Sequence, residues 1–170
     1  MNFKKIIVTL LLIATVLALA ACGNKSNDTT YSEGGFSFTL PSSMRRAYTE
    51  DCEFHLSTPD SAFLAKKLDG DFMQTQGVSK DITAKEYAAA YIENQMLDST
   101  RIDYKEDPER GTYSFKYNAS DTGEEYFHYI VVLGEPGSIW FVDMICLNEK
   151  ADIYTDTFET WQKSISYTKS

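Results

Sequence analysis

Two nearly continuous apolar segments, residues 125–133 and 139–147, constrain the fold of this chain most strongly. Apolar runs of this length are typical of strands that are covered on both faces. Five residues separate them, and the last four, Glu-Pro-Gly-Ser, suit a type II turn with proline and glycine at its central positions. A link this short makes the two strands antiparallel neighbours. The pair is therefore expected near the centre of an antiparallel sheet.

Five more segments have the pattern of strands. Residues 36–40 read Phe-Ser-Phe-Thr-Leu, in which apolar and polar side chains alternate as they do in a half-buried strand. The others span residues 52–56, 62–68, 102–106 and 112–117. In the last of these, Tyr113, Phe115 and Tyr117 share one face. Residues 72–82 show no clear pattern and are left unassigned.

Two helices are predicted, over residues 83–97 and about 150–165. The first opens with Thr83-Ala-Lys-Glu86, the spacing of a capping box. Each helix carries an apolar stripe that is expected to cover a sheet. The stripe residues are Ala84, Tyr87, Ala88, Tyr91 and Ile92, with Met96 at the edge, in the first helix, and Tyr154, Phe158, Trp161 and Ile165 in the second.

These elements predict an α+β fold in which a central antiparallel β-sheet of about six to seven strands is flanked by two helices. Gly35-Phe-Ser-Phe-Thr-Leu-Pro41 and Phe158-Glu-Thr-Trp-Gln-Lys-Ser-Ile165 bracket this region. In that order the segments resemble PsbP-like domains, including bacterial lipoproteins of the DcrB type. The resemblance covers residues 35–167 and implies the same architecture. Members of this group are mostly non-enzymatic accessory or poorly characterised proteins, and no catalytic motif is shared from which a functional residue could be transferred.

The first 22 residues have the layout of an export signal. Lys4 and Lys5 precede an apolar run, and Leu19-Ala20-Ala21-Cys22 follows it. The apolar run is shorter than the roughly 20 residues of a membrane span. The segment resembles a bacterial lipoprotein signal, whose lipobox is matched by residues 19–22. The resemblance implies that Cys22 is lipidated and becomes the first residue of a protein held on the extracytoplasmic face of the cell membrane.

The domains expected are therefore a signal peptide over residues 1–21, a flexible tether over residues 22–34 and a single α+β domain over residues 35–170. Residues 23–35 hold too few apolar groups to pack, which favours a tether. Without residues 1–21 the chain keeps 14 basic and 25 acidic residues, a net charge of −11. This balance argues against nucleic acid as a partner.

Two cysteines remain when Cys22 is assigned to lipid, namely Cys52 and Cys146. Export permits a disulfide between them, and two buried free thiols are the alternative. Sequence does not show whether their backbones approach closely enough for a bridge.

The chain offers little for catalysis. It contains only two histidines, His55 and His128, and no Gly-x-Ser-x-Gly turn. Both histidines lie on predicted strands, where they could meet beside Glu53, Glu125 or Asp143 to bind a metal weakly. Alternatively, they are surface residues or hydrogen-bonded strand residues. The second interpretation is favoured, so no catalytic residue, metal or cofactor is predicted.

The expected function is that of a membrane-anchored lipoprotein whose domain binds, without catalysis, another envelope protein or a small ligand. A structural or envelope-stress role without a ligand is the alternative, followed by an uncharacterised hydrolase. A deep pocket would favour a small ligand or catalysis, and an exposed aromatic patch would favour a protein partner.

Overall fold

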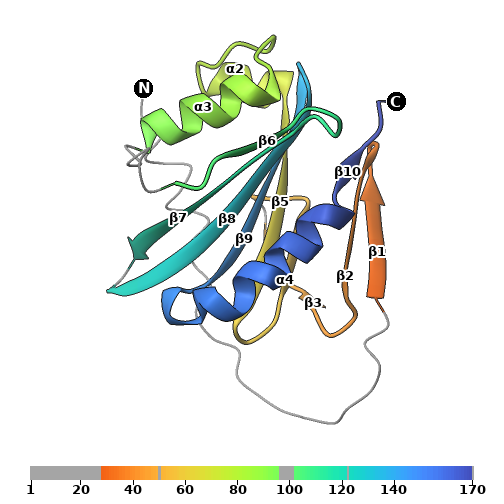
Figure 1. Cartoon of the computed structure of the whole chain (residues 1–170). Helices are drawn as coiled ribbons and strands as arrows, with labels where there is room; N and C mark the ends of the chain where they lie inside the picture. The colour runs from red at the N-terminus through yellow and green to blue at the C-terminus, as the bar shows by residue number, and fades with distance from the viewer. Residues whose placement is uncertain (1–27, 50, 96–101, 122, 170) are drawn as a thin grey trace.

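The computed structural model describes residues 28–49, 51–95, 102–121 and 123–169 of the chain. These residues form two antiparallel sheets and three α-helices, arranged in three layers (Figure 1). The expected signal peptide over residues 1–21, the lipidation residue Cys22 and Met96 lie outside the described residues.

The large sheet has seven strands, within the predicted six to seven, and all neighbouring strands are antiparallel. In spatial order the strands are β3 (Arg45–Arg46), β4 (Phe54–Ser57), β5 (Ser61–Asp69), β9 (Ser138–Leu147), β8 (Glu124–Glu135), β7 (Thr112–Asp121) and β6 (Lys105–Asp107). One of the seven is β3, which the sequence did not predict, whereas the predicted strand over residues 36–40 belongs to a second sheet. The two apolar segments become β8 and β9, which pair along ten residues each in the middle of the sheet. Their side chains are buried on both faces, and this explains why they lack alternation.

A second, smaller sheet consists of β1 (Asp28–Glu33), β2 (Phe36–Pro41) and β10 (Ser166–Tyr167). The predicted tether over residues 22–34 is therefore wrong for residues 28–33, which pair with β2 along six positions. Composition did not indicate this strand because its attachment is a backbone ladder, which polar side chains do not prevent. Tyr31 adds a side-chain contact, since its ring stacks on Phe38 with 5.1 Å between ring centroids.

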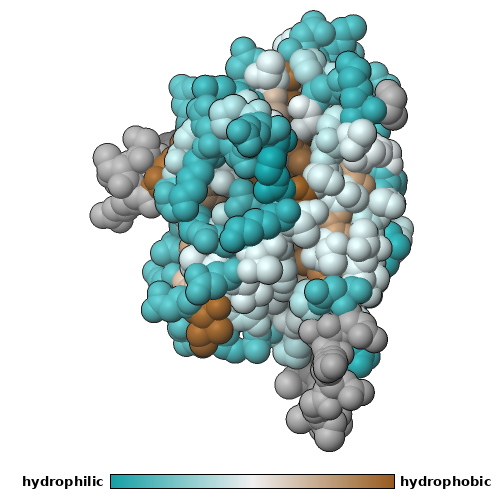
Figure 2. All heavy atoms as spheres, turned by 45° about the vertical axis from the view of Figure 1, so that its right-hand side comes forward, coloured by the Kyte–Doolittle hydropathy of each residue, from teal (hydrophilic) through white to brown (hydrophobic). Residues whose placement is uncertain are grey.

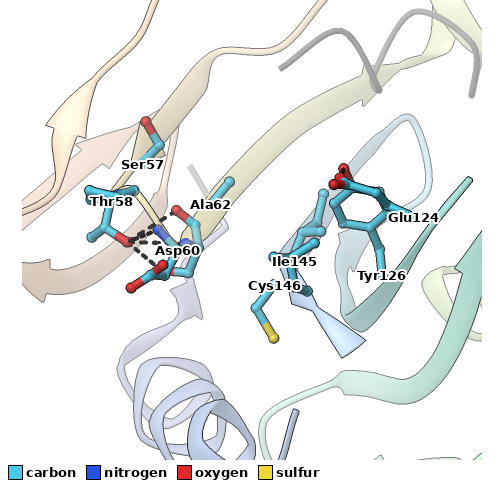
Figure 3. Close-up of a pocket in the computed structure, with 11 residues that line it drawn as sticks. Ser57, Thr58, Asp60, Ala62, Glu124, Tyr126, Ile145 and Cys146 are labelled. Atoms are coloured by element: carbon cyan, nitrogen blue, oxygen red, sulfur yellow. Dashed lines mark hydrogen bonds between the residues drawn. The ribbon is translucent and has the colours of Figure 1, made fainter. Parts of the chain in front are cut away.

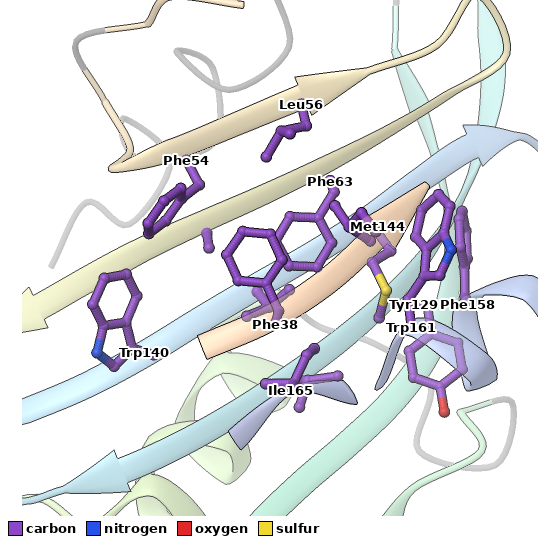
Figure 4. Packing of buried hydrophobic residues seen from close by; sticks show 14 of the residues in the cluster. Phe38, Phe54, Leu56, Phe63, Tyr129, Trp140, Met144, Phe158, Trp161 and Ile165 are labelled. Carbon is purple, nitrogen blue, oxygen red and sulfur yellow. The ribbon is translucent and has the colours of Figure 1, made fainter. Parts of the chain in front are cut away.

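Helix α4 (Ala151–Ser164) and the small sheet cover one face of the large sheet (Figure 1). A short 3-10 helix, η1 (Asn148–Lys150), leads into α4. Aromatic rings dominate the core between these layers: Phe38 stacks on Phe63 at 4.4 Å, and Phe36 stacks on Trp140 at 4.2 Å between centroids. Phe158, Trp161 and Ile165 of the predicted stripe are buried in the same core (Figure 4).

Helix α3 (Ala84–Asn94) packs on the opposite face, against β7 and β8. Thr83 and Glu86 form the predicted capping box, and Ala84, Tyr87, Ala88 and Tyr91 are buried as predicted. A short helix that the sequence left unassigned, α2 (Gly70–Thr75), precedes it. Its N-cap is Asp69, whose carboxylate accepts a hydrogen bond from the Phe72 amide at 2.8 Å.

Candidate functional site

The structure holds both described cysteines as free thiols. Ser61 of β5 pairs with Cys146, whereas Ala65 of β5 pairs with Phe54, two residues after Cys52. Four residues along a strand span about 13 Å, and a disulfide needs Cα atoms within about 7 Å. The Cys52–Cys146 disulfide that the sequence left open is therefore incompatible with this strand register.

The thiols are also poorly reactive. Burial raises the pKa of Cys52 to about 11, and the neighbouring Glu53 carboxylate acts in the same direction. Burial likewise raises the pKa of Cys146 to about 11. Since the thiolate is the nucleophile, neither sulfur is suited to catalysis near neutral pH.

His128 belongs to a buried polar network on the α3 side of the sheet. Its Nδ1 atom lies 3.1 Å from each carboxylate oxygen of Asp143 on the neighbouring strand β9. The ring of Tyr117 stacks on the imidazole with 4.7 Å between centroids, and the Tyr117 hydroxyl lies 3.0 Å from that of Tyr91. Burial raises the pKa of Tyr117 well above its usual range. His128 is thus the hydrogen-bonded strand histidine that the sequence favoured.

His55 lies on the same face but apart from this network. It pairs with Leu64, which pairs with Asp143, so two strand spacings, about 10 Å, separate His55 from that carboxylate. Both ring nitrogens of His55 are buried without a hydrogen-bond partner among the described residues. Within the described ranges, no group of three or more histidine, cysteine or acidic side chains is placed to hold a metal ion.

A cleft of about 210 Å³ opens at the end of the large sheet where β4 turns into β5. We call it the end cleft and define it by its lining: residues 57–62, Glu124 and Tyr126 of β8, and residues 145–147 of β9. Figure 3 shows the β4–β5 turn facing the β8 and β9 residues across the opening. Its volume is below the roughly 300 Å³ of pockets for drug-sized molecules. It therefore suits a small group, or one side chain of a partner.

The end cleft adjoins the polar network through the sheet register. Ala62 pairs with Ile145, and Ile145 pairs with His128, so these three residues lie in one row. Cys146 is next to Ile145 in the chain, and its side chain belongs to the core on the α4 side. Ala62 and Ile145 give the cleft an apolar lining, and the buried His128 lies next to Ile145 on the neighbouring strand.

The rim of the end cleft is polar. Thr58 holds the turn, since its Oγ1 accepts hydrogen bonds from the amides of Asp60 at 3.2 Å and Ser61 at 3.1 Å. Asp60 is paired with Lys150 of η1. The Tyr126 hydroxyl donates to Glu124 at 2.7 Å, which raises the pKa of that tyrosine. Hydroxyls and carboxylates around an apolar lining are suited to binding a ligand. They are less suited to nucleophilic catalysis, because neither the Thr58 nor the Tyr126 hydroxyl is hydrogen-bonded to a histidine that could act as a base.

Sequence reasoning did not identify the end cleft, which gathers three segments that are far apart in the chain. Residues 59–61 lie between the predicted strands 52–56 and 62–68, and their sequence does not indicate a cleft. Of the three acidic residues that the sequence offered as neighbours of the histidines, Asp143 is the one that contacts His128.

Among the described residues, no helix has the length and apolarity to cross a membrane.

Several solved structures share this fold. The PsbP protein of the cyanobacterium Synechocystis sp. PCC 6803 (CyanoP) aligns with a TM-score of 0.58 at 14% identity, over 88% of this chain and 99% of that one. LpqN of Mycobacterium tuberculosis, described as involved in cell envelope biogenesis, aligns with a TM-score of 0.50 at 15% identity, over 85% of this chain and 92% of that one. A Bacteroides thetaiotaomicron protein aligns with a TM-score of 0.51 at 15% identity, over 82% of this chain and 47% of that one. No protein-family model and no curated protein matches the sequence. The fold is therefore PsbP-like.

Proposed function

We propose that this chain is a lipid-anchored accessory protein on the extracytoplasmic face of the cell membrane, and that it binds a partner through the end cleft without catalysing a reaction. The observation that carries the proposal is the lipobox, Leu19-Ala20-Ala21-Cys22, which five residues separate from Asp28, the start of the first described strand. Two acyl chains on one cysteine hold a protein stably on a bilayer.

The fold supports an accessory role. LpqN has the same architecture and is described as involved in cell envelope biogenesis, and CyanoP is a PsbP protein. The described helices offer no alternative means of crossing the bilayer. A lipid on Cys22 would supply the attachment that these residues lack.

A binding role is favoured over hydrolysis by how the chain uses His128. Asp143 occupies Nδ1 of its imidazole, and Tyr117 covers a face of the ring. A triad would need a nucleophilic hydroxyl or thiol on the other ring nitrogen. Among the described residues no such group is hydrogen-bonded to His128, and the two described thiols lie outside this arrangement.

Metabolic labelling with a palmitate analogue tests the anchor. The wild-type chain is expected to take up label and to gain mass on a peptide that begins at Cys22, and an inhibitor of lipoprotein signal peptidase should block its maturation. Cys22→Ser should abolish the label, whereas Cys52→Ser, the matched control, should keep it. Unlabelled wild-type protein would overturn the proposal.

Site-specific photocrosslinking in intact cells tests the end cleft. A benzoylphenylalanine at Tyr126, inside the cleft, is expected to give a discrete adduct. The same probe at Tyr48, which is 88% exposed and lies outside the cleft, serves as the control. A pattern of adducts that is identical at the two positions would argue against binding in the cleft. Absence of any adduct, together with loss of envelope integrity on deletion, would instead favour the structural role.

A further inference from the structure

The end cleft and the start of the folded domain lie at the same end of the molecule. Strand β1 begins at Asp28, which pairs with Pro41 at the end of β2. The Pro41 carbonyl accepts a hydrogen bond from the Met44 amide, and the next residue, Arg45, pairs with Ser57 in the lining of the cleft. Figure 1 shows the start of β1 at the same end as the β4–β5 turn and the start of α4.

The chain between the lipidation residue and the domain is short. Only residues 23–27 separate Cys22 from Asp28, and five residues span at most about 18 Å when fully extended. The sheet is much longer, since the 12 residues of β8 rise about 40 Å from the cleft end to the β8–β9 turn. If the β8–β9 turn faced the bilayer, Asp28 would lie about 40 Å from it, beyond the reach of the connection.

We infer that the end of the domain that carries the end cleft faces the membrane. This inference rests on the proposed lipidation of Cys22. It places the β4–β5 turn near the headgroups and the β8–β9 turn away from them. The cleft then opens towards the bilayer and away from the bulk solvent.

The charge of this end keeps the domain from lying on the headgroups. At this end, acidic residues outnumber the basic residues Arg45 and Lys150. The acidic residues are Asp28, Asp60, Asp121, Glu124, Glu125 and Glu149. Like charges repel over about one Debye length, roughly 8 Å at physiological salt. A water layer is therefore expected between anionic headgroups and the cleft, which leaves the cleft open to a ligand.

Two exposed turn prolines provide a matched test of this orientation, Pro59 at the end cleft and Pro136 in the β8–β9 turn. The lipidated protein, carrying either Pro59→Cys or Pro136→Cys, is labelled with a fluorophore and reconstituted in phosphatidylcholine vesicles that contain a headgroup-attached quencher. Quenching is expected to be at least about twofold stronger at position 59, because the two turns differ in height by about 40 Å. Equal quenching, or stronger quenching at position 136, would overturn the inference.

A longer segment between Cys22 and Asp28 tests whether the short length of this segment sets the orientation of the domain. Insertion of about fifteen Gly/Ser residues after Gly23 extends the reach beyond the height of the sheet and should bring the two positions to similar quenching. Quenching that stays stronger at position 59 would show that reach does not set the orientation. Mass measurement confirms the lipid independently, so a failed orientation test leaves the proposed anchor standing, whereas an unlipidated wild-type chain overturns both.

Discussion

The Nδ1 atom of His128 lies 3.1 Å from both carboxylate oxygens of Asp143, across the β8–β9 pair and within the buried face of the sheet. Register places His128 opposite Ile145 and Asp143 opposite Ile130, so the pair is a diagonal contact on one face. Buried polar groups need such partners, because an unpaired one retains its full desolvation cost.

Asp143→Ala is expected to lower the free energy of unfolding by about 1–3 kcal/mol, since it leaves the buried imidazole without its acceptor. Asp143→Asn keeps an acceptor and should cost less. The control is Asp103→Ala, which removes ion pairs of this half-exposed carboxylate with Lys105 and Lys116, each worth at most about 1 kcal/mol. Urea unfolding measures all three. Equal losses for the Asp143 and Asp103 alanine variants would contradict a structural role for the pair.

Gly34 and Gly35 occupy the turn between β1 and β2, both with positive φ, and they should respond differently to alanine. A Cβ on Gly35 would lie 2.1 Å from the Thr168 carbonyl oxygen, whereas one on Gly34 meets nothing within 4 Å. Gly34→Ala is expected to cost about 1 kcal/mol for the left-handed backbone alone. Gly35→Ala should cost at least about 2 kcal/mol, because it also displaces β10. Thermal unfolding of the two variants gives the comparison, and similar melting temperatures would contradict this packing.

Strand β1 should contribute to stability although its sequence is polar. A chain that starts at residue 35 is expected to be at least about 2 kcal/mol less stable than one that starts at residue 28, because it loses the ladder to β2 and the packing of Tyr31. Denaturant titration of the two truncated proteins tests this. Tyr31→Ala in the longer chain separates the side-chain part from the ladder. Equal stability of the two chains would restore the interpretation of residues 28–34 as a tether.

His55 makes stability depend on pH. Burial lowers the pKa of His55 below its ordinary value of 6.5, so the folded chain binds this proton less readily than the unfolded chain. Because the unfolded chain takes up this proton first, the free energy of unfolding decreases as the pH falls below about 6.5. His55→Leu should flatten the unfolding free energy between pH 7.5 and about pH 5.5 relative to wild type. Parallel curves for the two proteins would show that His55 does not titrate with folding.

Cys52 and Cys146 should be reduced thiols that react slowly with alkylating reagents. Folded protein treated with iodoacetamide near neutral pH is expected to stay largely unmodified at Cys52 and Cys146, because burial raises the pKa of each thiol to about 11. In urea without a reducing agent both should be alkylated, which intact mass reports. A failure to modify them in urea, reversed by prior reduction, would reveal a disulfide and contradict the strand register.

Local patterns carried most of the sequence prediction. Each pattern that predicted an element correctly lies within a short stretch of sequence. Examples are the apolar runs of β8 and β9 and the capping box at Thr83. Strands β3 and β10 have two residues each, and Ser166 pairs with Ser37 from the far end of the chain. No local pattern indicates such a pair. Helix α2 is too short for an apolar stripe, and the end cleft depends on register between distant strands.

Both edges of the large sheet have a consequence for a protein crowded on a surface. One edge is β3, which consists of two exposed arginines, and the other begins with β6, Lys-Glu-Asp, which pairs with the first three residues of β7. Short, charged edge strands offer little backbone for another sheet to extend. If Cys22 carries the proposed lipid, molecules confined to the membrane would meet one another often, at high local concentration. The charged borders would let neighbouring copies collide without joining their sheets into fibres, so that a densely populated surface stays a collection of separate domains.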